Sequence, residues 1–85
     1  MRIDDYLSSV YLIKRRTLAK EWINGGKVRL NGNRIKAGHE IKPGDKIEIY
    51  YQHRKIGLEI VDVPHKSIAK NQAENYYKII EDIEV

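Results

Sequence analysis

The sequence has 85 residues, of which 33% are charged and 41% are hydrophobic, and its formal net charge is +4 at pH 7. This length supports one small domain, and the composition excludes a disordered chain and a membrane protein, because no run approaches the roughly 18 apolar residues of a membrane span. The absence of cysteine excludes disulfides and thiolate metal sites. The first residues lack the apolar core of a secretory signal, so we expect a cytoplasmic protein without membrane contact.

The positive charge is concentrated in the first part of the chain. Residues 1–36 carry nine Lys or Arg against three Asp or Glu, a net charge of +6, whereas residues 37–85 carry seven against nine, a net charge of −2. A basic half on a folded domain is typical of a protein that binds a polyanion. A solvated surface without a ligand is the alternative explanation.

The first predicted element is a helix over residues 3–12. Its apolar residues recur at steps of three and four, so they share one face, which includes Tyr11. Asp4 and Asp5 lie near its start, where negative charge complements the helix dipole.

A second helix is predicted over residues 16–24, with Gly25-Gly26 as its stop signal. Trp22 falls on its apolar face, which favours core packing over base stacking. Arg16 and Lys20 share the other face, where like charges four residues apart cost about 0.2–0.5 kcal/mol when nothing neutralises them. This cost indicates an anionic ligand.

The stretch KVRLNGNRIK predicts a β-hairpin, because two alternating runs are joined by Asn31-Gly32, the preferred pair for a type I′ turn. This turn sets Arg29 opposite Arg34. It also sets Lys27 opposite Lys36, and all four side chains are expected on the face away from the core. Since like charges directly opposite each other destabilise a sheet, four cations on one face indicate bound phosphates.

Downstream, the Lys-Pro-Gly-Asp sequence of residues 42–45 predicts a type II turn, followed by strands over residues 46–51 and 56–63. Residues 67–84 have apolar residues at helical spacing after Ser67, a candidate cap, and predict a third helix. The sequence leaves open whether this helix packs on the sheet or docks a partner. The predicted fold class is α+β, with two N-terminal helices packed on a small, mostly antiparallel sheet and a C-terminal tail helix.

The sequence offers no motif for catalysis, a metal or a cofactor. His39, His53 and His65 are far apart, without the short spacing of zinc ligands. The stretch Asn24-Gly25-Gly26-Lys27 lacks the upstream Gly and the following Ser or Thr of a phosphate-binding loop. Asp4-Asp5 has no second domain to form a catalytic cleft. We therefore expect a non-enzymatic protein without metal or cofactor.

The order of a helix, a basic second helix, a Gly-x-Val-x-x-Asn-Gly hairpin and a Lys-Pro-Gly-Asp turn resembles the αL motif, the RNA-binding module named after small-subunit ribosomal protein S-four. The residues that carry this resemblance are Arg2, Ile3, Asp4, Leu7, Leu12, Lys14, Arg16, Ala19, Gly26, Val28, Asn31, Gly32, Lys36, Gly44 and Asp45. With its length and its QAENYYKII tail, the chain is similar to the bacterial ribosome-associated factors that include the fifteen-kilodalton heat-shock protein and ribosome quality-control protein P. The resemblance implies an RNA-binding domain over residues 1–66, with the core motif over about 1–50, and a tail over residues 67–85.

The resemblance also implies a function at the ribosome. Such factors bind the large ribosomal subunit when a peptidyl-tRNA remains on it after subunit splitting, and they contact both 23S ribosomal RNA and the tRNA. In the quality-control version, the factor assists alanine tailing of the stalled chain by a partner protein that recruits tRNA. Nothing in the sequence demands more than a monomer.

Together, the residues and the resemblance predict one set of RNA-binding side chains, which comprises Arg2, Lys14, Arg15, Arg16, Lys20, Lys27, Arg29, Arg34 and Lys36. Two positions depart from the family pattern. Asp5 stands where the family usually has a basic residue, and Tyr11 stands where it has an arginine. Tyr11 is able to stack on a base or a ribose, or to pack in the core, and the sequence leaves both open.

An alternative function is that of an RNA-binding adaptor or a ribosome-assembly factor. The same module occurs appended to RNA-modifying enzymes and tRNA synthetases, so a lone copy could deliver a partner protein to structured RNA. The acidic, aromatic tail would then bind that partner. All of these functions use the same phosphate-binding surface, so the sequence does not separate them.

Overall fold

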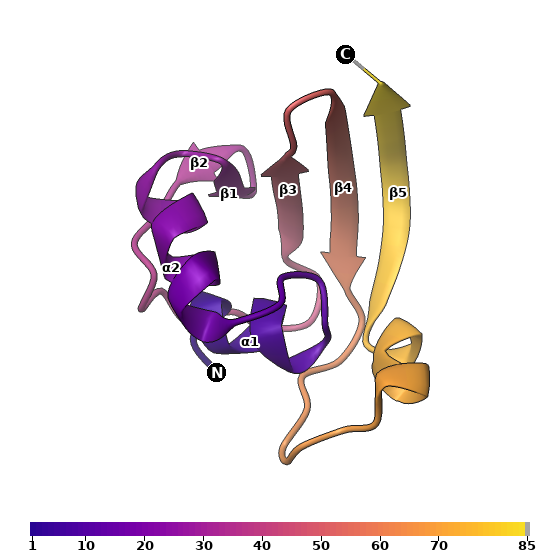
Figure 1. Cartoon of the computed structure of the whole chain (residues 1–85). Helices are drawn as coiled ribbons and strands as arrows, with labels where there is room; N and C mark the ends of the chain where they lie inside the picture. The colour runs from indigo at the N-terminus through magenta and orange to yellow at the C-terminus, as the bar shows by residue number, and fades with distance from the viewer. Residues whose placement is uncertain (85) are drawn as a thin grey trace.

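The computed structural model describes residues 1–84, so Val85, the last residue of the expected tail, lies outside the described residues. Two α-helices precede a five-stranded antiparallel sheet with the strand order β2-β1-β3-β4-β5 (Figure 1). The elements are α1 (Ile3–Ser9), α2 (Arg16–Asn24), β1 (Val28–Leu30), β2 (Asn33–Arg34), β3 (Lys46–Tyr50), β4 (Arg54–Ile60), the 3-10 helix η1 (Lys70–Asn75) and β5 (Tyr77–Glu84). This arrangement confirms the predicted α+β class with two N-terminal helices and an antiparallel sheet.

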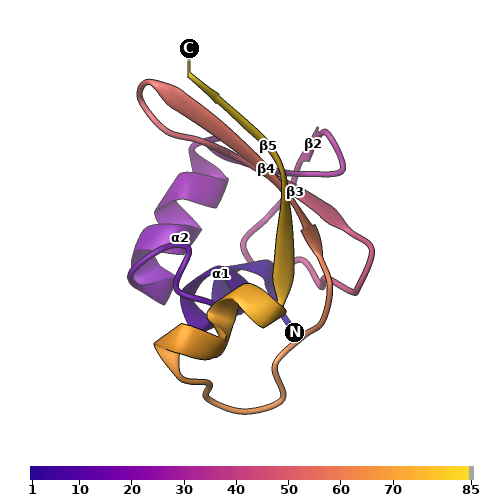
Figure 2. The same cartoon turned by 90° about the vertical axis from the view of Figure 1, so that its right-hand side faces the viewer.

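Both α-helices lie on the same side of the twisted sheet, and the core fills the space between them (Figure 2). The apolar side chains that are at most 1% exposed are Ile3, Tyr6, Leu7, Val10, Ala19, Ile23, Val28, Ile47, Ile49, Leu58 and Ile60. The Tyr6 hydroxyl donates a hydrogen bond to the Tyr76 carbonyl at 2.6 Å. Burial raises the pKa of Tyr6 far above its usual value, so this hydroxyl keeps its proton and remains a donor.

Helix α1 ends at Ser9, three residues earlier than predicted. The reason is Tyr11, which adopts a φ of +60° and reverses the chain. The Leu12 amide donates to the Leu7 carbonyl at 3.0 Å and the Tyr11 amide donates to the Ser8 carbonyl at 3.2 Å, which is the hydrogen-bond pattern of a Schellman motif. Because Tyr11 is not a glycine, the sequence contains no signal that α1 ends here.

Helix α2 has the predicted bounds and ends in a second Schellman motif. Here Gly26 supplies the positive φ of +77°. The Lys27 amide donates to the Trp22 carbonyl at 2.9 Å, which closes the last turn. This turn delivers the chain directly into β1.

The Asn31-Gly32 turn and its register are confirmed, because both residues have a positive φ and Arg29 lies opposite Arg34. Strand β2, however, has only two residues, so the predicted pairing of Lys27 with Lys36 is outside the β1–β2 ladder. The prediction of four cations on one face of a hairpin is therefore wrong. The chain leaves β2 after Arg34 because residues 36–41 run beside the start of α1 instead, with the Ile3 amide donating to the His39 carbonyl at 2.8 Å.

The predicted tail helix is also wrong. Residues 70–75 form the short η1, and β5 pairs with β4 along seven residue pairs as the edge strand of the sheet. The segment YYKIIEDIE is rich in aromatic and β-branched residues, which fit a strand, and β4 offers an open edge. Arg54 donates two hydrogen bonds to Asp82 across this pair, at 2.7 and 2.6 Å, and these bonds lower the pKa of Asp82.

The backbone conformation of Gly44 in the Lys42–Asp45 turn can be tested by substitution. Gly44 has a φ of +94° with nothing within 4 Å of an added Cβ, whereas Gly38 has no positive φ and an added Cβ there would meet Arg2 Cζ at 3.6 Å. We expect Gly44→Ala to lower the free energy of unfolding by about 1–2 kcal/mol through backbone strain alone. The matched control Gly38→Ala should change it by less than about 0.5 kcal/mol in the same urea unfolding experiment. Equal effects of the two substitutions would contradict this explanation.

Candidate RNA-binding surface

A group of four cations lies near the place where the two helices begin. We call it the helix-start cluster, and it consists of Arg2, Arg16, Lys20 and Lys36. The Arg2 guanidinium donates to both oxygens of Asp4, from Nε at 3.1 Å and from Nη2 at 3.0 Å. Arg16 Nε lies 3.6 Å from Asp4 and 3.0 Å from Asp5. The two carboxylates therefore fix both guanidinium groups at one place.

Asp4 is 0% exposed, although it carries a charge. Its carboxylate also accepts a hydrogen bond from the Asp5 amide at 2.8 Å, at the positive end of the α1 dipole. Burying a carboxylate is costly unless it is paired and hydrogen-bonded, and Asp4 meets both conditions. Arg2 and Arg16 remain 42% and 54% exposed in their side chains, so each keeps N–H groups free to bind phosphate oxygens.

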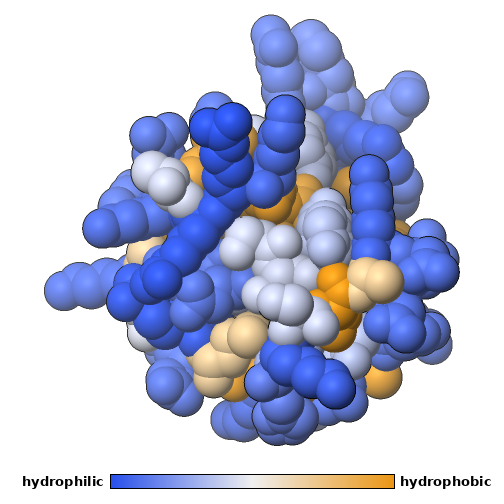
Figure 3. Space-filling view, turned by 60° about the horizontal axis from the view of Figure 1, so that its bottom comes forward, coloured by the Kyte–Doolittle hydropathy of each residue, from blue (hydrophilic) through white to orange (hydrophobic). Residues whose placement is uncertain are grey.

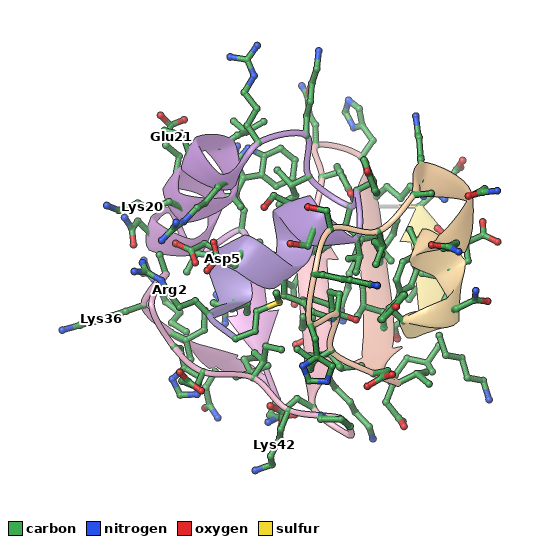
Figure 4. The ribbon with its side chains drawn as sticks, turned by 90° about the horizontal axis from the view of Figure 1, so that it is seen from below. Arg2, Asp5, Lys20, Glu21, Lys36 and Lys42 are labelled. Atoms are coloured by element: carbon green, nitrogen blue, oxygen red, sulfur yellow. The ribbon has the colours of Figure 1, made fainter. Side chains whose placement is uncertain are left out.

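Lys20 and Lys36 complete the cluster from α2 and from the loop after β2. Figure 4 shows Arg2, Lys20 and Lys36 along the same edge of the molecule, with Asp5 beside Arg2. Both lysines are exposed, and none of the ion pairs among residues 1–84 involves them. Figure 4 also shows Glu21 beside Lys20, so four cations lie near three carboxylates, which leaves a positive surface suited to a polyanion.

Hydrophilic side chains cover most of the face shown in Figure 3, with only small hydrophobic areas between them. No helix of residues 1–84 is long and apolar enough to cross a membrane. Within the same residues, no group of three or more His, Asp or Glu side chains is placed to hold a metal ion.

Lys14 and Arg15 lie in the connection between the helices, and both are exposed. They line a hollow of about 370 Å³ together with the exposed Leu18 and with Glu21. Tyr11, in the same connection, is 48% exposed and donates from its hydroxyl to the Ile68 carbonyl at 2.9 Å. The alternative that Tyr11 packs in the core is thus wrong, and its stacking on a base or a ribose stays a prediction.

The three predicted cations of the hairpin each contact a group of the protein, and their contact with RNA stays a prediction. Lys27 Nζ lies 5.3 Å from the centroid of the Trp22 ring, and the Arg29 guanidinium lies 5.8 Å from the Tyr50 ring. Arg34 donates from Nη2 to the Asn24 carbonyl at 2.9 Å, so it binds a free carbonyl at the C-terminal end of α2. Each cation thus contacts a different group of the protein.

Reasoning from sequence alone missed the role of Asp4, which it interpreted only as a helix-start residue. The Arg2-x-Asp4 spacing at the start of a helix was an available signal, because it allows a bidentate contact within one turn. The contact of Arg16 with the same carboxylate had no signal in the sequence, since it depends on how α2 packs against α1.

The fold and the helix-start cluster define an RNA-binding domain of the S4 class, and residues 1–47 match the S4 domain family. The chain is 35% identical over 82 residues to the "RQC P-site tRNA stabilizing factor" of Bacillus subtilis, covering 96% of this chain and 94% of that protein. It is 53% identical over 64 residues to the Helicobacter pylori factor of the same name, covering 75% of this chain and 76% of that protein. The chain therefore belongs to the family of S4-domain RQC P-site tRNA stabilizing factors.

The solved structures agree with this assignment. The structure of heat shock protein 15 from Vibrio cholerae superimposes with a TM-score of 0.87 at 26% sequence identity, covering 93% of this chain and 80% of that chain. The resemblance to the αL motif and to this family, drawn from the sequence, is confirmed.

The contacts of Asp4 lead to a prediction about stability. We expect Asp4→Asn to lower the free energy of unfolding by about 1–3 kcal/mol, because it weakens two charge-assisted contacts and leaves a buried group poorly paired. The matched control Asp5→Asn removes a carboxylate that is 34% exposed in its side chain, and should cost less than about 1 kcal/mol. Chemical unfolding of both variants checks this order, and a larger loss in Asp5→Asn would contradict it.

Proposed function

We propose that this protein binds the large ribosomal subunit that carries a stalled peptidyl-tRNA, and that it acts in ribosome-associated quality control. The observation that carries the proposal is the similarity to RQC P-site tRNA stabilizing factors over nearly the whole length of both chains. The helix-start cluster supplies the chemistry that such a function needs.

The helix-start cluster would contact phosphates of 23S ribosomal RNA and of the tRNA. Arg2 and Arg16 present planar donor groups held by Asp4, which suits two-point contact with phosphate oxygens. Lys20 and Lys36 add mobile charges on either side. Because these contacts go to the RNA backbone, recognition would depend on the shape of the RNA more than on its base sequence.

The proposed role is to hold the tRNA in position, without catalysis by this chain. The acidic side chains of the surface support this, because both Asp4 and Asp5 are engaged by arginines. Holding the peptidyl-tRNA would assist alanine tailing of the stalled chain by a partner protein that recruits tRNA. The protein would act in the cytoplasm as a monomer.

The proposal is tested by co-sedimentation with large ribosomal subunits, with and without bound peptidyl-tRNA, across a salt series. We expect binding to require the tRNA-occupied subunit and to weaken steeply with salt. Binding that is indifferent to tRNA would favour the ribosome-assembly alternative. No binding to either subunit preparation would overturn the proposal and favour the adaptor.

The helix-start cluster is tested by Lys20→Gln combined with Lys36→Gln, because neither lysine supports the fold through an ion pair of the described residues. We expect the slope of log affinity against log salt to fall by about 2, one for each lost phosphate contact. The matched control combines Lys66→Gln with Lys70→Gln, in the loop before η1 and in η1, since neither lysine takes part in an ion pair among residues 1–84. An equal change in the control would show that only net charge matters.

A further inference from the structure

A hollow lined by aromatic side chains lies between the last turn of α2 and the start of the connection from β3 to β4. Its volume is about 560 Å³, and we call it the aromatic pocket. The residues that line it are Trp22, Lys27, Tyr50, Tyr51 and Gln52. This volume falls within the range of about 300–1,000 Å³ that is typical of small-ligand sites.

Two rings form a fixed corner of this pocket. The Trp22 and Tyr51 rings pack edge to face, with centroids 5.3 Å apart and planes at 74°. Both are only partly buried, although they pack against the core, and Tyr50 beside them is 36% exposed. Burial raises the pKa of the Tyr51 phenol, so this wall stays uncharged near neutral pH and does not repel anions.

Three cations lie near the aromatic rings of Trp22 and Tyr50. Lys27 is exposed and its Nζ lies over Trp22, so its flexible side chain is free to move from the ring to a nearby anion. Arg29 lies against Tyr50, and its Nε is buried without a hydrogen-bond partner among the described residues. Lys55 is also near Tyr50, but Glu48 and Glu81 neutralise it at 2.9 Å each. Lys27, which lines the pocket and takes part in none of the ion pairs among residues 1–84, is therefore the cation available to a ligand there.

This combination selects one class of ligand. Aromatic rings bind the flat face of a nucleobase, cations bind the attached phosphate, and the Gln52 amide both donates and accepts hydrogen bonds at the base edge. We infer that the aromatic pocket binds one unstacked nucleotide of RNA, with its base against Trp22 and Tyr51 and its phosphate near Lys27.

The inference deepens the RNA-binding function and rests on it. Helix α2 spans about 12 Å between its first and last residues, at 1.5 Å per residue. The helix-start cluster and the aromatic pocket lie at its two ends, so one RNA segment can contact both. The cluster would bind the backbone of folded RNA, and the pocket would add a base from an adjoining single strand.

Trp22 is the only tryptophan of the chain, so its fluorescence reports on the pocket directly. The probes are a single-stranded hexa-adenylate RNA and a blunt RNA duplex of six base pairs. We expect saturable quenching by the single strand, through stacking, and little quenching by the duplex, although the duplex binds. Equal quenching by both probes at saturation would overturn the inference.

Substitutions then separate the pocket from the helix-start cluster. Trp22→Leu should weaken single-strand binding by about 5- to 150-fold, the effect of losing one stacked base, and leave duplex affinity unchanged. Lys27→Gln, which leaves the core intact, should weaken the quenching titration of the single strand while the duplex still binds as wild type. Unchanged single-strand affinity in Lys27→Gln and in a folded Trp22→Leu would also overturn the inference. If neither probe binds to the wild-type protein, the result would instead count against the RNA-binding function itself.

Discussion

The buried carboxylate of Asp4 is the contact on which the RNA-binding surface depends. It lies at the start of α1 and binds Arg2 from the preceding residues and Arg16 from α2. Without this carboxylate, the two guanidinium groups would repel each other. Without the guanidinium groups, burying the carboxylate would cost too much free energy. The charges that we propose for RNA binding are thus also the charges that stabilise the junction between the two helices.

The same contact explains how a small domain tolerates so much positive charge. Arg34 is stabilised in a different way, because it donates a hydrogen bond to the Asn24 carbonyl at the negative end of the α2 dipole. Lys20 and Lys36 have no such partner among residues 1–84 and extend into solvent. The surface therefore divides into arginines that are held in place and lysines that are mobile, which suits specific contact and long-range attraction respectively. Asp5, which departs from the family pattern, lowers the total charge but helps to hold Arg16.

The C-terminal strand is held in the domain by pairing with β4 and by cross-strand ion pairs. β5 extends the sheet beyond β4, where Arg54 and Lys55 pair with Asp82 and Glu81. These ion pairs engage two of the nine acidic residues that the sequence carries in its second half. Asp82 and Glu81 of β5 are thus engaged within the sheet, and β5 is the edge strand at the other end of the sheet from β2 (Figure 1).

The sequence by itself determined the local features, because they depend on neighbouring residues. These include the bounds of α2, the Asn31-Gly32 turn with its register, the Lys42–Asp45 turn and the apolar alternation of β3. It also located the excess of positive charge and the family resemblance.

Only the tertiary structure decided which distant residues meet. Tyr11 ends α1 in a conformation that its side chain does not favour, and β5 is a strand because β4 provides an edge, although the apolar spacing fits a helix. Lys36 leaves the predicted hairpin because β2 is short and the chain turns toward α1, whereas Arg29 and Arg34 stay paired. Arg16 meets Asp4, and Trp22 meets Tyr51, only through packing between elements, and such contacts leave no periodic signal in a single sequence.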